Sequence, residues 1–161
     1  MPSSADGNWL WGLMPGQIIV QTENKLRRLV KLYNGKQLMK KILVIEDDLH
    51  ILNMLEEIFQ SEGFEVVTYP DKNSVKGIII NRPDLVLLDN KLKDGFGHEL
   101  CSEIKANELT KHIPVILISG YDDLETMAKQ CGADACMAKP FDLAALVQLV
   151  KQYTDMRIEA K

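Results

Sequence analysis

From residue 41 onward, short apolar runs alternate with segments whose apolar residues recur at helical spacing. The apolar runs are ILVI (42–45), FEVVTY (64–69), LVLL (85–88), PVILIS (114–119) and ACMA (135–138). Most are nearly continuous, as is typical of strands covered by helices on both faces, whereas the second alternates partly, as an edge strand does. Five strands in alternation with helices predict an α/β fold with a parallel sheet and right-handed crossovers.

Five helices are predicted between and after these runs, each from apolar residues three or four positions apart. Their apolar positions are Ile51, Leu55 and Ile58; Val75, Ile78 and Ile79; Phe96, Leu100 and Ile104; Leu124, Met127, Ala128 and Cys131; and Leu143, Leu146, Val147 and Val150. SEG (61–63) ends the first helix, Pro83 ends the second, and Asp142 is placed to cap the last. Ligands of such folds bind at the carboxyl ends of the strands, so polar residues there are candidates for a site.

The first 38 residues do not share this pattern. Residues 24–36 (NKLRRLVKLYNGK) place apolar residues on one helical face among basic ones, which suits a partner or a membrane surface. MKKILVIEDD from Met39 resembles a natural start, so the segment can also be interpreted as a leader or a misplaced start. We therefore expect an N-terminal extension over 1–38, an organised domain over 39–155 and a short tail over 156–161.

Composition and charge narrow the functional classes. The 161 residues are 46% hydrophobic and 26% charged, which supplies one core. Residues 1–38 carry a net +3, which leaves −7 on the other 123 residues, and an acidic body argues against non-specific nucleic-acid binding. Cys101, Cys131 and Cys136 lack metal or disulfide spacing and favour a reducing cytoplasm. No membrane span or secretory signal is predicted.

Polar residues end four of the five predicted strands. Glu46 and Asp47 end the first, Asp89 the third, Ser119 the fourth and Lys139 the fifth. Three carboxylates, a hydroxyl and an ammonium should therefore meet at one edge of the sheet. Carboxylates at this density suit Mg²⁺, and a carboxylate can also attack phosphorus to give an aspartyl phosphate. The pattern predicts phosphoryl transfer, in which the ammonium pairs with the phosphoryl group or the free carboxylate and the hydroxyl donates to a phosphoryl oxygen.

In four segments the chain resembles the receiver domain of a two-component response regulator. These segments are KILVIEDD (41–48), DLVLLDNKLKDGFG (84–97), IPVILISGYDD (113–123) and GADACMAKPF (132–141). The resemblance covers residues 40 to about 153 and implies a flavodoxin-like, doubly wound (βα)5 fold with strand order 2-1-3-4-5. It implies a phosphoprotein that signals by changing what it binds, and not an enzyme that turns over a substrate. Because only TDMRIEAK (154–161) follows the last predicted helix, we expect a stand-alone receiver.

The resemblance also implies roles for the acidic residues. Asp89 would accept the phosphoryl group from a histidine on a partner. Asp47 and Asp89 would bind Mg²⁺ directly, together with the backbone carbonyl of Lys91, and Glu46 would act through a water molecule. Asp48 would lie outside this set and cap the first helix.

Ser119 and Lys139 would sense the phosphorylated state, and the Lys139–Pro140 bond would be cis, as in the family. The implied partners are a histidine kinase or histidine phosphotransfer protein and a downstream protein target, without direct nucleic-acid contact. Phosphorylation could also pair two copies of the chain.

Three features depart from the family pattern. Lys93 stands where the family usually has Pro, four residues after the acceptor, so the loop is expected to be looser or differently shaped. Cys136 stands where an aromatic switch residue is typical, so the signal on the neighbouring helical face should be smaller or carried otherwise. The stretch from Ser119 to Gly132 is slightly short, which predicts a truncated or shifted fourth helix.

Three other interpretations remain open at this point. A pseudo-receiver would keep the fold as an interaction module without phosphorylation, and Cys136 favours it. A phosphatase with an aspartyl nucleophile would place D-x-D after the first strand, where this chain has IEDD, and would need an insertion long enough for a substrate cap. A flavodoxin-like cofactor binder would need a Gly- or Ser/Thr-rich phosphate loop after the first strand, which the sequence lacks.

Overall fold

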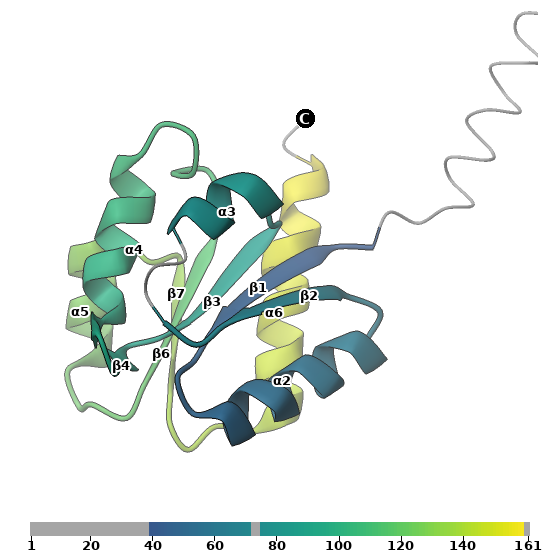
Figure 1. The fold of residues 1–161 in the computed structure, drawn as a ribbon, viewed down its shortest axis with the longest axis horizontal. Helices are drawn as coiled ribbons and strands as arrows, with labels where there is room; N and C mark the ends of the chain where they lie inside the picture. The colour runs from purple at the N-terminus through teal and green to yellow at the C-terminus, as the bar shows by residue number, and fades with distance from the viewer. Residues whose placement is uncertain (1–38, 72–74, 160–161) are drawn as a thin grey trace, which may run out of the picture. The chain divides into compact units, whose positions relative to one another are not determined.

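The computed structural model describes residues 39–71 and 75–159, in which strands and helices alternate (Figure 1). The elements are β1 (Lys41–Ile45), α2 (Leu49–Ser61), β2 (Glu65–Tyr69), α3 (Val75–Asn81), β3 (Leu85–Asp89), β4 (Lys91–Leu92), β5 (Gly95–Phe96), α4 (Gly97–Ala106), β6 (Val115–Ser119), α5 (Leu124–Cys131), β7 (Ala135–Ala138) and α6 (Leu143–Glu159). The basic helix expected in residues 24–36 lies outside the described residues. Within the described part of the chain, no helix combines the length and apolar character needed to cross a membrane.

The five longer strands form one parallel sheet in the order β2-β1-β3-β6-β7. Numbered among themselves, they have the order 2-1-3-4-5, which confirms the expected doubly wound fold. Helices α2 and α6 cover one face of the sheet, and α3, α4 and α5 cover the other (Figure 1). The inner strands β1, β3 and β6 are therefore buried on both faces, which explains why they are apolar at almost every position.

Two hydrophobic layers hold the helices on the sheet. In β1, Ile42 and Val44 belong to the layer under α2 and α6, whereas Leu43 and Ile45 belong to the layer under α3, α4 and α5. Successive side chains of a strand point to opposite faces, and a shift of one residue would exchange them. The packing of β1 thus fixes its register, and with it the point where the acidic residues leave the sheet.

The last helix differs from its prediction in two ways. It runs to Glu159, although the apolar pattern ended at Val150 and a tail was expected from residue 156. The fully buried Thr154 donates its hydroxyl to the carbonyl oxygen of Val150 at 3.0 Å, which satisfies this polar group inside the helix. Leu143, expected in the core, is 38% exposed. Asp142 caps the helix as predicted, since its carboxylate accepts the N–H of Ala145 at 2.8 Å.

The loop after β3 is a small hairpin. Lys91 pairs with Phe96 and Leu92 with Gly95, so residues 93–94 form a two-residue turn. Gly95 has a φ of 145°, which glycine adopts more readily than other residues. Lys93, which stands where the family usually has Pro, is the first of the two turn residues. Phe96, predicted on the apolar face of the next helix, instead lies in this hairpin with 44% of its surface exposed, because α4 begins one residue later.

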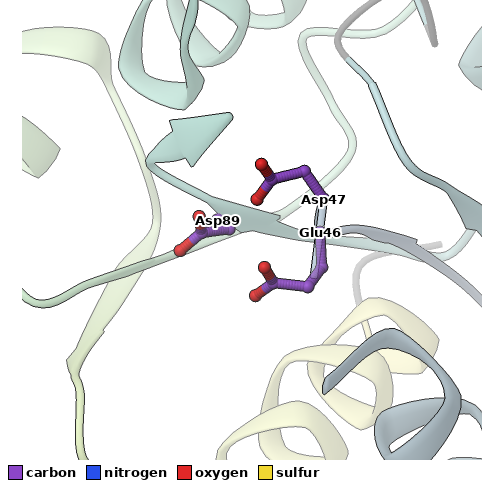
Figure 2. A group of neighbouring side chains, drawn as sticks. All are labelled: Glu46, Asp47 and Asp89. Carbon is purple, nitrogen blue, oxygen red and sulfur yellow. The ribbon is translucent and has the colours of Figure 1, made fainter. Parts of the chain in front are cut away.

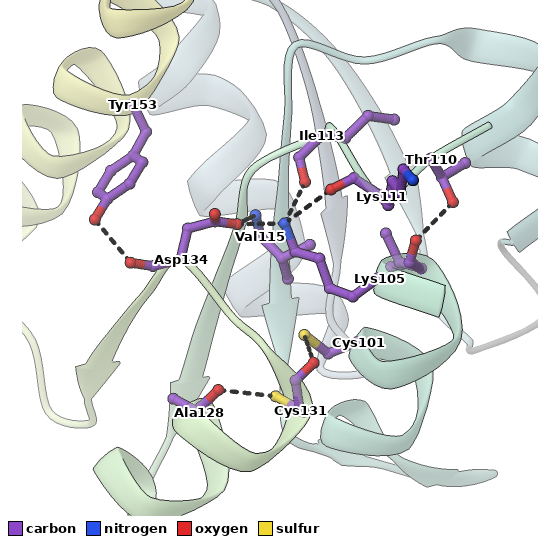
Figure 3. Close-up of polar contacts among 11 residues, drawn as sticks. Cys101, Lys105, Thr110, Lys111, Ile113, Val115, Ala128, Cys131, Asp134 and Tyr153 are labelled. Atoms are coloured by element: carbon purple, nitrogen blue, oxygen red, sulfur yellow. Dashed lines mark hydrogen bonds and ion pairs between the residues drawn. The ribbon is translucent and has the colours of Figure 1, made fainter. Parts of the chain in front are cut away.

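A polar network ties α4 to β6 and α6 (Figure 3). The Lys105 ammonium donates to Asp134 Oδ2 at 2.6 Å and to the carbonyl oxygen of Ile113 at 2.8 Å. The same carboxylate oxygen accepts the N–H of Val115 at 2.7 Å, and the backbone carbonyl of Asp134 accepts the hydroxyl of Tyr153 at 2.7 Å. Asp134 therefore links α4, β6 and α6 to one another.

Replacing Asp134 with alanine is expected to lower the free energy of unfolding by about 1–3 kcal/mol, because the N–H of Val115 loses its acceptor and the ammonium of Lys105 loses its carboxylate partner. Urea denaturation measures this loss. As a control, Glu108→Ala removes a more exposed ion pair to Lys111 and should cost less than about 1 kcal/mol. Equal losses in the two variants would contradict the structural role given to Asp134.

Candidate functional site

Three carboxylates gather at the carboxyl edge of the sheet (Figure 2). Glu46 and Asp47 follow β1, and Asp89 ends the adjacent strand β3, where Ile45 is paired with Leu88. One carboxylate oxygen from each acid lies within 4.8 Å of the others. Glu46 and Asp89 are only 3% and 6% exposed, and Asp47 is half-buried. The structure thus brings together Glu46, Asp47 and Asp89, which were predicted at the ends of two different strands.

Lys139, which follows β7, reaches two of these acids. Its ammonium lies 2.8 Å from Glu46 Oε2 and 2.9 Å from Asp89 Oδ1. Its backbone N–H donates to the carbonyl oxygen of Ser119 at 2.8 Å, which holds the end of β7 against β6. The Lys139–Pro140 bond is cis, as expected.

Burial and charge shape the site together. Burial raises the pKa of Glu46 above its ordinary value, against the hydrogen bond from Lys139, which acts to lower it. Burial acts to lower the pKa of Lys139, but its bonds to Glu46 and Asp89 outweigh this and raise it. When all groups are ionised, three carboxylates face one ammonium, which leaves a net charge of −2 in an open cleft of about 400 Å³. Hard oxygen donors with this charge suit a divalent cation.

Backbone N–H groups orient the second oxygens of the two buried acids. Glu46 Oε1 accepts the N–H of Asp48 at 3.1 Å, and Asp89 Oδ2 accepts the N–H of Lys91 at 3.0 Å. Asp48 caps α2, as expected: its carboxylate accepts the N–H of His50 at 2.9 Å, and such backbone bonds lower its pKa. Both buried carboxylates are therefore held at two points, one by the ammonium and one by the backbone.

Ser119 ends β6, the strand next to Asp89, and is 1% exposed. Its Oγ accepts the N–H of Tyr121 at 3.2 Å, and this bond does not use the hydroxyl hydrogen, which is left to donate. Tyr121 and Gly120 line the same cleft as the acids and Lys139. The five side chains expected at the strand ends thus lie on neighbouring strands at one edge, four of them around the cleft.

Cys136 lies on β7 beside this cleft. It is half-buried and lines a groove of about 500 Å³ together with residues 120–126 and Lys139. Burial raises the pKa of its thiol, which disfavours the reactive thiolate. Helix α5, predicted to be truncated or shifted, has eight residues and borders the groove.

Two residues beside Asp89 were not predicted from the sequence. Asn90 directly follows Asp89 and is 1% exposed. Gly97 starts α4 so close to this strand end that a Cβ atom there would clash with the carbonyl oxygen of Asp89. The signals in the sequence were a polar residue directly after a buried strand and a glycine at the start of a helix. Neither signal is specific on its own.

Comparison with known proteins agrees with the geometry. A family profile described as the response regulator receiver domain matches residues 42–151. Sporulation initiation phosphotransferase F of Bacillus subtilis is 33% identical over 123 residues, which cover 73% of this chain and 96% of that protein. The phosphate regulon transcriptional regulatory protein PhoB of Pseudomonas aeruginosa is also 33% identical, over 70% of this chain and 50% of PhoB. The match thus spans about half the length of that relative.

Solved structures show the same fold. A CheY-like response regulator receiver domain protein from Methanospirillum hungatei JF-1 is 32% identical, with a TM-score of 0.68 over 76% of this chain and 99% of that one. The receiver domain of sensor histidine kinase PA1611 from Pseudomonas aeruginosa PAO1, which holds a magnesium ion in its active-site cleft, is 26% identical, with a TM-score of 0.66 over 73% of this chain and 98% of that one. The chain therefore belongs to the family of response regulator receiver domains, the receiver modules of two-component phosphorelay systems.

Proposed function

We propose that this protein accepts a phosphoryl group on Asp89 from a histidine of a kinase or phosphotransfer protein. The observation that carries the proposal is the bridge from Lys139 to both Glu46 and Asp89 in the cleft at the sheet edge. It places a buried carboxylate beside the cation that a bound phosphoryl group needs. The phosphorylated form would then bind a downstream protein or a second copy of the chain.

The donor set fits Mg²⁺, which prefers carboxylate, carbonyl and water oxygens. Asp47 and Asp89, with the backbone carbonyl of Lys91, would hold the ion directly, and Glu46 would act through a water molecule. Support comes from the clustered carboxylate oxygens and from the magnesium ion in the related PA1611 receiver domain. When bound, the ion would offset negative charge on the phosphoryl oxygens.

The chain's own groups account for the rest of the transfer. A carboxylate oxygen of Asp89 forms the bond to phosphorus while the bond from phosphorus to the histidine nitrogen breaks. The Lys91 N–H holds Asp89 Oδ2, and Lys139, now beside Oδ1, pairs with a phosphoryl oxygen. Ser119 donates its hydroxyl to another phosphoryl oxygen. Positioning and charge do most of the work in such transfers.

We expect self-phosphorylation and self-dephosphorylation only, with no turnover of p-nitrophenyl phosphate. All three cysteines are free thiols, which supports a reducing, cytoplasmic setting. The alternative is a pseudo-receiver that binds partners without phosphorylation, and the cysteine at position 136 is the observation in its favour.

Intact-mass spectrometry after incubation with acetyl phosphate tests the proposal. With Mg²⁺ the protein should gain one labile phosphoryl group, and with EDTA it should gain none, because the phosphoryl charge is no longer offset. A folded protein that binds Mg²⁺ but gains no group would establish the pseudo-receiver alternative instead.

Replacing Lys139 with methionine should make stability depend more strongly on Mg²⁺. Without the metal, the variant leaves two close carboxylates uncompensated and should lose about 2–3 kcal/mol of unfolding free energy, less than for a fully buried pair, because Lys139 is 25% exposed. The net charge of the cleft becomes −3, so Mg²⁺ should restore more stability than it adds to the wild type.

Thermal unfolding in EDTA and in Mg²⁺ measures both effects. Lys93→Met, which removes an exposed ammonium from the hairpin turn, is the matched control and should respond to Mg²⁺ as the wild type does. A smaller metal response in Lys139→Met than in this control would show that Lys139 does not offset the carboxylates.

A further inference from the structure

Asn90 is a buried polar residue that the phosphoryl transfer described above does not use. It directly follows Asp89 and is 1% exposed. A buried amide without partners is costly, so the groups that it binds indicate which parts of the structure it holds together.

The side chain of Asn90 joins two helices. Its Oδ1 accepts the backbone N–H of His98 at 3.0 Å and the imidazole Nδ1 of the same residue at 2.9 Å. A backbone N–H can only donate, so the amide oxygen is the atom that faces α4. Because this oxygen can only accept, the Nδ1 of His98 carries a proton. The imidazole is stacked on Phe96, with ring centroids 5.4 Å apart. The Nδ2 group therefore faces the other way and donates to the thioether sulfur of Met127 on α5 at 3.6 Å.

The backbone of Asn90 is held just as firmly. Its N–H donates to the carbonyl oxygen of Ile118 and its carbonyl accepts the N–H of Gly97, both at 2.8 Å. Gly97 in turn lies against the carbonyl oxygen of Asp89 with no room for a side chain. The backbone of the acceptor, the start of α4 and the side of α5 thus meet at one residue.

We infer that Asn90 is a positioning residue of the acceptor site. It fixes the backbone of Asp89 against α4, and through Met127 it links the acceptor to α5. The inference rests on the proposed role of Asp89. Transfer depends on the placement of the reacting atoms, so a small shift of Asp89 slows it. The contact with Met127 also connects Asp89 to α5 without involving residue 136. At that position this chain has a small cysteine in place of the aromatic switch residue typical of the family.

The first test replaces Asn90 with leucine, which removes the side-chain hydrogen bonds and keeps a side chain of similar length. The rate at which the folded protein gains a phosphoryl group from acetyl phosphate and Mg²⁺ should fall roughly tenfold. Asn53→Leu makes the same change at an exposed position of α2 and should react at the wild-type rate. A purely structural role would lower the unfolding midpoint of Asn90→Leu and leave this rate unchanged.

The second test replaces Met127 with leucine, which removes the sulfur acceptor and keeps an apolar side chain. This variant should gain the phosphoryl group at the wild-type rate. Amide hydrogen exchange in α5 should change less on phosphorylation than it does in the wild type. An undiminished change would overturn the link to α5.

The outcomes separate this inference from the proposed function. If the wild type gains no phosphoryl group, the proposed function fails and the positioning role falls with it. If the wild type gains the group and Asn90→Leu does so equally fast, the proposed function stands and only the positioning role is overturned.

Discussion

Replacing Asp89 with asparagine is expected to abolish uptake of the phosphoryl group and to weaken Mg²⁺ binding, while the protein stays folded. An amide has nearly the shape of the carboxylate, so packing at the end of β3 is kept. The amide lacks the nucleophilic carboxylate oxygen that forms the bond to phosphorus. It also lacks the negative charge that attracts the cation. The remaining carboxylates, Glu46 and Asp47, face Lys139 with a net charge of −1 in place of −2, which reduces the attraction for a divalent ion.

Intact-mass spectrometry with acetyl phosphate and calorimetric titration with Mg²⁺ measure the two losses. Asp123→Asn removes one negative charge from the neighbouring β6–α5 loop, where the side chain is exposed and makes no capping bond. It should take up the phosphoryl group and the metal as the wild type does. Uptake by Asp89→Asn at the wild-type rate would show that another residue is the acceptor.

Replacing Gly97 with alanine should damage stability and phosphoryl uptake together. The new Cβ atom would clash with the carbonyl oxygen of Asp89 and lie 2.9 Å from the Cα of Asn90. Alanine favours a helix over glycine by up to about 1 kcal/mol, but these neighbours are backbone atoms that cannot swing aside. We expect a net loss of about 1–3 kcal/mol of unfolding free energy and phosphoryl uptake at least about tenfold slower, since the acceptor must shift.

Gly120→Ala is the matched control for this variant. Gly120 lies in the cleft after Ser119, and a Cβ atom there would meet nothing within 4 Å. Urea denaturation should therefore show wild-type stability for Gly120→Ala. Equal damage in both variants would mean that the close approach of Gly97 to the acceptor strand has no special effect.

The fold could be predicted from the sequence because its signals are local and repeated. The apolar runs fixed the five main strands, and strict alternation with helical segments implied a parallel sheet. The convergence of Glu46, Asp47 and Asp89 follows from this topology alone, since parallel strands end at one edge. Their assignment to a phosphoacceptor site depended on the family resemblance as well.

The features that could not be predicted depend on tertiary contacts. Phe96 has the right spacing for the apolar face of α4, but the hairpin before that helix exposes it. Asn90 is typical of a loop by residue type, and only the packed structure shows that its amide is buried between His98 and Met127. The steric role of Gly97 likewise exists only once α4 lies against β3.

The most direct test of the central claim is to locate the phosphoryl group. The wild-type protein would be treated with acetyl phosphate and Mg²⁺ and reduced with borohydride, which converts an aspartyl phosphate to homoserine, and its peptides would be sequenced by tandem mass spectrometry. We predict homoserine at position 89 and unmodified acids at positions 46 and 47. A protein that gains the group without homoserine at 89, or with reduction at another acid, would contradict the role of Asp89.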